Sequence, residues 1–157
     1  MAILIEKMKC GLCGNPIMKG ESTVSFSSFI SNEADPLFHF SDSAFHRGCF
    51  EKHPSARAVE ARYAEVREQN KPENRRCLVC RRIITNPDDF FFLGCLTDDS
   101  SNPLYRLNCA HLHRSCLSQW PDLPTVSAFA EKQLESGAWR GAGMRWLVNI
   151  LKKGQAK

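Results

Sequence analysis

The sequence predicts a small α+β protein made of two similar units, which are joined by a helix and followed by a helical tail. Three observations favour this class. One pattern of cysteines and histidines occurs twice with the same spacing. Each copy encloses β-branched and aromatic segments of the length of hairpin strands. Apolar residues at helical spacing lie between the copies and after the second one.

Composition limits the compartment and the class of protein. The chain has 157 residues, 43% hydrophobic and 24% charged, which is typical of a globular protein. The N-terminus lacks the order of basic, apolar and small residues of a secretion signal. No apolar run approaches the roughly 18 residues of a membrane span. We therefore expect an intracellular protein, cytoplasmic or nuclear, with no membrane partner. In such a reducing compartment, paired Cys-x-x-Cys motifs indicate metal or redox chemistry more often than disulfides.

Two similar segments indicate an internal repeat, FHRGCF at 45–50 and LHRSCL at 112–117. Each follows a Cys-x-x-Cys pair at the same distance, so the chain holds Cys-x2-Cys-x32-His-x2-Cys twice, without a gap. The similarity extends to PLFHF at 36–40, which aligns with PLYRL at 103–107. The repeated residues are Cys10, Cys13, His46 and Cys49 in the first copy and Cys77, Cys80, His113 and Cys116 in the second.

Each copy predicts the same order of elements. A tight turn carries the Cys-x-x-Cys pair, with Gly11 and Gly14 permitting it in the first copy. Two strands follow, at 23–30 and 37–40 in the first copy and at 90–96 and 104–107 in the second. The His-x-x-Cys pair then falls on one face of a first helical turn.

These residues predict two structural zinc ions. Three cysteines and one histidine are a standard tetrahedral ligand set for zinc. Because all four positions are filled by protein, no place is left for an activated water, and we expect no enzymatic role. Sequential grouping, in which each copy closes its own site, is favoured because the whole unit repeats. Crossed grouping would instead give one all-cysteine site and one site with two histidines and two cysteines.

The order of turn, hairpin and helix resembles the treble-clef zinc fingers, the superfamily that includes LIM and RING domains. CGLCGNPI with FHRGCF is similar to the first finger of a LIM domain, and HRSCLSQW is similar to the middle of a RING domain. The resemblance implies two treble-clef fingers, at 1–53 and 73–120. A LIM domain would continue at once into another finger, and a RING domain would supply a further Cys-x-x-Cys after Trp120. Neither is present in this sequence.

Three residues near the second pattern do not repeat. Cys95 aligns with Ser28, Cys109 with Asp42 and His111 with Ala44. Cys109-x-His111 has the form of a further ligand pair, as in RING domains. The favoured interpretation is a small buried cysteine in the hairpin and a polar residue at its end.

Two segments outside the copies predict helices. A linking helix at 54–72 presents one apolar stripe, formed by Val59, Tyr63 and Val66. The tail at 121–157 predicts two helices, at 125–136 and 141–153. Its large apolar residues either cover the second finger or form an exposed anchor for a protein partner, since aromatic residues dominate such contacts. The candidate anchors are Phe129, Trp139 and Trp146.

The sequence predicts a zinc-stabilised module that binds another protein, as an adaptor, a regulator or an inhibitor such as a toxin-neutralising protein. A RING-like ubiquitin-ligase module that binds a conjugating enzyme is the first alternative, supported by HRSCLSQW. A nucleic-acid-binding zinc finger is the second, because the net charge of +4 lies after Lys71. The arginines that would serve it are Arg75, Arg76, Arg81, Arg82, Arg106 and Arg114.

Overall fold

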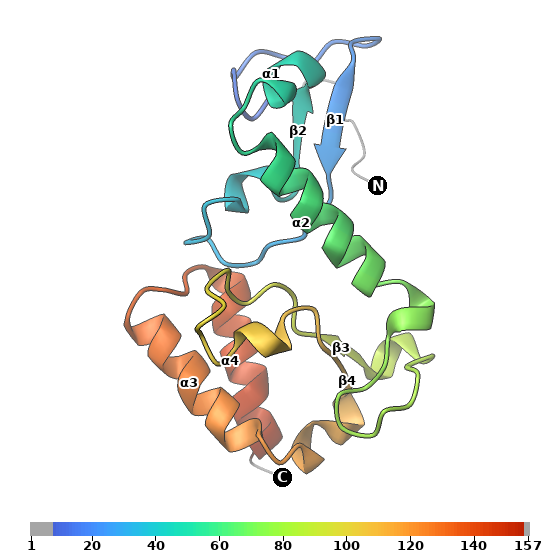
Figure 1. Cartoon of the computed structure of the whole chain (residues 1–157), viewed down its shortest axis with the longest axis vertical. Helices are drawn as coiled ribbons and strands as arrows, with labels where there is room; N and C mark the ends of the chain where they lie inside the picture. Colours follow the sequence, from blue (N-terminus) through green and yellow to red (C-terminus); the bar gives the residue numbers. More distant parts are fainter. Residues whose placement is uncertain (1–7, 156–157) are drawn as a thin grey trace.

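The chain forms two small antiparallel hairpins, one in each half, with helices around them (Figure 1). This computed structural model describes residues 8–155. The outer ends of the predicted first unit and of the predicted tail, residues 1–7 and 156–157, lie outside it. The α+β class is therefore as expected from the sequence. In the first half, β1 (Thr23–Phe26) pairs with β2 (Ser43–His46), and α1 (Arg47–Glu51) follows at once.

The second half repeats this order with small changes. A short 3₁₀ helix, η3 (Pro87–Asp89), leads into β3 (Phe90–Phe92), which pairs with β4 (His111–His113). A 3₁₀ helix, η5 (Arg114–Gln119), takes the place of α1. Between the halves, α2 (Ala56–Gln69) and a 3₁₀ turn, η2 (Pro72–Asn74), span the length of the link. Figure 1 shows α2 running from the first hairpin down toward the second half.

The prediction for the second strand of each hairpin was wrong. The segments expected to be strands, 37–40 and 104–107, instead contain the 3₁₀ helices η1 (Phe38–Phe40) and η4 (Tyr105–Leu107). The first strands are also shorter than expected. A side-chain hydrogen bond forms a turn just before each 3₁₀ helix. Asp35 accepts from the Leu37 N–H (2.7 Å) before η1, and Asn102 accepts from the Leu104 N–H (2.9 Å) before η4.

The chain then reverses before each true second strand. Asp42 and Cys109, which are equivalent in the repeat, have φ values of +55° and +58°. This left-handed conformation turns the chain into β2 and β4, so that each strand ends on the histidine of the repeated pattern, His46 or His113.

Each half has its own hydrophobic core. The first core is rich in phenylalanine, with neighbouring ring centroids 5.1–6.3 Å apart, and α2 adds its predicted stripe to it through buried Val59 and Val66. The Tyr63 ring meets Phe26 edge-on at 5.0 Å. The rings of this core are Phe26, Phe29, Phe40, Phe45 and Phe50.

The second core is completed by the tail. It packs α3 (Leu123–Glu135) against α4 (Ala142–Gln155), as Figure 1 shows, and α4 contacts the second hairpin where the ring of Trp146 lies 5.8 Å from that of Phe91. Gly137, with φ +76°, ends the turn after α3. The predicted helices at 125–136 and 141–153 correspond to these two elements within a few residues.

A seam of polar and apolar contacts joins the two halves. Buried Asn32 donates to the Ala138 carbonyl (2.9 Å) and accepts from the Arg140 N–H (2.8 Å), both in the tail. Ile30 forms a β-bridge with Cys95. These contacts hold the first half against the second one.

Candidate metal centres

The first cluster lies where the Cys-x-x-Cys turn meets the end of β2. The ligand atoms of Cys10, Cys13, His46 and Cys49 all lie within 4.8 Å of one another. His46 Nδ1 is 3.4 Å from Cys13 Sγ and 4.0 Å from Cys49 Sγ. Ligand atoms around a tetrahedral zinc ion with bonds of about 2.0–2.3 Å lie about 3.3–3.8 Å apart. The cluster therefore has close to the size and the donor set that zinc requires.

The second cluster has nearly the same dimensions. The ligand atoms of Cys77, Cys80, His113 and Cys116 also lie within 4.8 Å of one another. His113 Nδ1 is 3.4 Å from Cys80 Sγ and 3.9 Å from Cys116 Sγ. The structure thus groups the ligands sequentially, each copy forming its own cluster.

The repeat also holds for the backbone that shapes each cluster. The N–H groups of Gly14 and Arg81 close the two Cys-x-x-Cys turns by donating to the carbonyls of Cys10 and Cys77, at 2.9 Å in both. Both residues are left-handed, with φ +73° for Gly14 and +63° for Arg81. Arginine in this conformation is strained where glycine is not. The same turn is therefore formed in the second copy without its glycine.

Hydrogen-bond donors lower the pKa of one thiol in each cluster. Burial acts to raise the pKa of Cys10, but the backbone N–H groups of Cys13, Leu12 and His46 outweigh it and lower the pKa to about 6. In the second cluster, the backbone N–H of Arg82 and its side chain lower the pKa of Cys80 to about 6. Since thiolate is the metal-binding form, one sulfur in each cluster is ready to bind at neutral pH.

The two clusters differ in what surrounds the histidine. His46 Nε2 lies 3.2 Å from the Glu21 carboxylate and 3.3 Å from the Pro16 carbonyl. A carboxylate on the far nitrogen orients a ligand imidazole and makes it a stronger donor. Among residues 8–155 the structure shows no such carboxylate at His113. Glu21 was missed from the sequence, although Asp88, an acidic residue, occupies its equivalent position.

The three residues that do not repeat lie outside both clusters. Cys95 and Cys109 are buried and contact the first core. His111 is buried against the rings of Phe90 and Phe92, at centroid distances of 5.5 and 5.0 Å. Within the described residues, all eight cysteines are free thiols. The interpretation that these three residues are not metal ligands therefore agrees with their positions.

The three candidate anchors have different environments. Trp139 is 3% exposed, and its indole N–H donates to the Leu96 carbonyl (2.8 Å), so it is a core residue and offers no exposed surface. Phe129 is half-buried against the second core. Trp146 on α4 is 49% exposed, and its ring lies 5.8 Å from that of Phe91. Only Trp146 of the three presents a large exposed ring.

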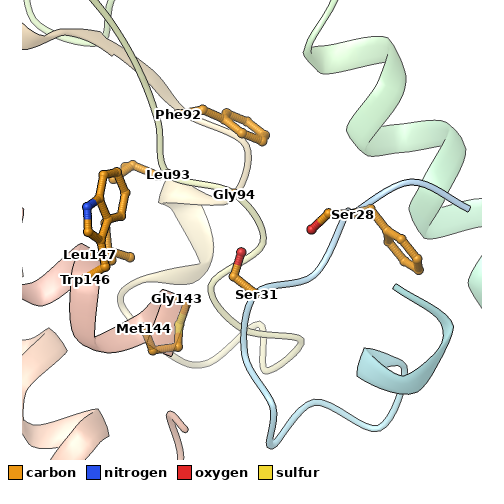
Figure 2. Close-up of a pocket in the computed structure, with 10 residues that line it drawn as sticks. Ser28, Ser31, Phe92, Leu93, Gly94, Gly143, Met144, Trp146 and Leu147 are labelled. Carbon is orange, nitrogen blue, oxygen red and sulfur yellow. The ribbon is translucent and has the colours of Figure 1, made fainter. Parts of the chain in front are cut away.

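Trp146 lies at a cavity of about 190 Å³ that opens along the seam between the halves. Figure 2 shows Ser28 and Ser31 on the segment after β1, facing Gly94 and the side chains of α4. The apolar part of the lining comes from both halves. It consists of Phe29, Phe92, Leu93, Met144, Trp146 and Leu147.

Comparison with protein-family models, with curated proteins and with solved structures finds no match to this chain. In the described part, no helix has both the length and the apolar character needed to cross a bilayer. The two clusters, each with three cysteines and one histidine, are therefore the main guide to function, since each could hold a metal ion.

Proposed function

We propose that the protein is a protein-binding module whose two treble-clef units are each stabilised by one structural zinc ion. The zinc part of this proposal is supported by the two clusters, whose donor atoms and dimensions suit zinc. Each cluster connects the Cys-x-x-Cys turn to the residues at the end of a hairpin. A metal ion would therefore cross-link these segments and contribute directly to folding.

Zinc in these clusters has a structural role in the proposal. Each cluster offers four protein ligands, the full tetrahedral set, whereas catalytic zinc keeps a position for water or substrate. Three thiolates and one neutral imidazole would also give the zinc site a net negative charge. Zinc in such a site is a poor Lewis acid and activates water weakly.

The binding part of the proposal rests on the surface around Trp146. A large exposed ring beside an apolar cavity is the arrangement of an interface anchor. Arg145, next to Trp146 on α4, and Lys153, at the end of that helix, are exposed. We therefore expect the partner to be a protein segment that inserts an apolar side chain into the cavity and carries acidic residues beside it.

The experiment compares two surface variants of the full chain. Trp146→Ala should reduce capture of the partner by at least tenfold, the loss typical of a central aromatic anchor, about 2 kcal/mol. Met18→Ala is the matched control, because Met18 is a large exposed apolar residue on the first half. Partners that co-purify with the wild-type chain are quantified by mass spectrometry. Equal capture by both variants would contradict the proposed surface.

The two alternatives receive less support. A RING-like module crosses its ligand pairs between two metals, whereas the clusters here are sequential. For nucleic-acid binding, three of the candidate arginines already have contacts within the protein. Arg75 and Arg114 lie 4.8 and 5.8 Å from the centres of the Phe90 and Phe91 rings, and Arg106 pairs with Asp122 at 3.0 Å. Protein binding is therefore the function that we favour.

A further inference from the structure

The second half contains a pair of cysteines that the metal clusters do not use. Cys95 Sγ and Cys109 Sγ lie 4.0 Å apart, and the two residues are only 4% and 6% exposed. Their equivalents in the first half are Ser28 and Asp42. The pair is thus an addition to the second copy and has no part in the repeated zinc pattern.

The backbone holds the two thiols together at the end of the β3–β4 hairpin. The Cys109 N–H donates to the Gly94 carbonyl at 2.8 Å, which places Cys109 beside the residue that precedes Cys95. Cys95 in turn forms its bridge with Ile30 of the first half. The two sulfurs therefore lie at one end of the hairpin, at the seam between the halves. A modest change of side-chain rotamer would bring them from this separation to the distance of an S–S bond.

A guanidinium from the linking helix lies next to this pair. Arg62 of α2 pairs with Asp98 and also lies beside the Cys95 thiol. Its Nη1 is buried and has no hydrogen-bond partner in the described structure. The hydrogen bond with Cys109 lowers the pKa of Cys95, and Arg62 acts in the same direction against the effect of burial. The same hydrogen bond, together with burial, raises the pKa of Cys109.

This asymmetry gives the two sulfurs different chemical roles. Thiolate reacts with oxidants and thiol does not, so Cys95 is the attacking sulfur and Cys109 keeps its proton until it resolves the product. Neither sulfur lines the cavity at the seam, but the cavity reaches the residue beside Cys95, so a small opening there would admit an oxidant. The cavity lining includes Ser28, Phe29 and Gly94, and Gly94 directly precedes Cys95 (Figure 2).

We propose that Cys95 and Cys109 are a redox site that forms a disulfide on exposure to a hydroperoxide. The Cys95 thiolate attacks the peroxide, the O–O bond breaks, and sulfur passes two electrons to oxygen to give a sulfenic acid and an alcohol, or water from hydrogen peroxide. Cys109 then attacks this sulfur, the S–S bond forms, and water leaves. In sum, two thiols and one hydroperoxide give one disulfide, one alcohol or water, and one water. This inference is independent of the proposed function.

The test uses the full chain in its reduced, metal-containing form with one equivalent of hydrogen peroxide. Free thiols are alkylated in denaturant, and the chain is then digested with trypsin. Because cleavage follows Arg82, Arg106 and Arg114, Cys95 and Cys109 fall on separate peptides, 83–106 and 107–114. The expected result is one cross-linked product of these two peptides, lighter than their sum by two hydrogen atoms, with the metal content unchanged. The metal content of the chain is also measured before peroxide is added. A chain without metal at that point would count against the zinc proposal, whatever the result for Cys95 and Cys109.

One outcome would overturn the redox site, and another would overturn the role given to Arg62. One is full alkylation of Cys95 and Cys109 while the ligand cysteines oxidise and metal is released. The other concerns Arg62, for which Arg62→Lys keeps the charge and Arg62→Gln removes it. We expect cross-linking to be several-fold slower in Arg62→Gln and close to wild type in Arg62→Lys. Equal rates in all three proteins would show that Arg62 does not activate Cys95.

Discussion

Replacing Cys13 by serine is expected to remove one of two zinc ions and to unfold the first half of the protein. Serine is a poor zinc ligand, and the cluster would keep only three of its four donors. Because zinc binding contributes directly to folding in such units, the loss should amount to several kcal/mol, a large part of the stability of a small domain. Cys80→Ser should do the same to the second half.

The measurement is metal content per chain together with thermal unfolding. Cys95→Ser is the matched control, because it removes a buried thiol that is outside both clusters and has serine, Ser28, at its equivalent position. The control should keep both ions. A Cys13→Ser protein with two zinc ions and wild-type thermal stability would show that Cys13 is not a ligand.

The second large effect is expected at Trp139. Trp139→Ala should lower the free energy of unfolding by about 3–5 kcal/mol, the usual cost of removing a buried aromatic ring from a core. It would also leave the Leu96 carbonyl without its indole donor. This residue ties the start of α4 to the loop after β3, so its loss should loosen the tail from the second hairpin.

Urea unfolding of the metal-containing protein measures this effect, with Trp146→Ala as the comparison. Trp146 is half-exposed, and we expect its removal to change stability by less than about 1 kcal/mol. The two tryptophans would then separate cleanly into one that stabilises the core and one that is free to bind. Similar destabilisation by both substitutions would contradict the positions assigned to them.

The two groups of candidate metal ligands were predictable from the repeat, since residue type and spacing are local properties of the sequence. The helices were predictable for the same reason, because apolar periodicity placed α2 and marked the stripe of Val59 and Val66. The strand error came from PLFHF and PLYRL, whose aromatic and apolar residues suit a strand. Asp35 and Asn102 instead start a tight turn there, and nothing in strand propensity records that side-chain bond.

Features that depend on contacts between distant segments were not predictable. Asn32 is one polar residue in a loop until the fold brings Ala138 and Arg140 to it. The role of Glu21 as a partner of the His46 ring can be seen only in the folded chain, where the first half brings its carboxylate next to His46 Nε2. The pairing of Cys95 with Cys109, and the approach of Arg62 from another helix, likewise follow from tertiary structure.

Native mass spectrometry of the chain, purified without chelator, tests the central claim most directly. We predict two zinc ions per chain, loss of the folded circular-dichroism signal when a strong chelator removes them, and recovery when zinc is returned. A chain that carries no metal and keeps its fold in the chelator would contradict the account.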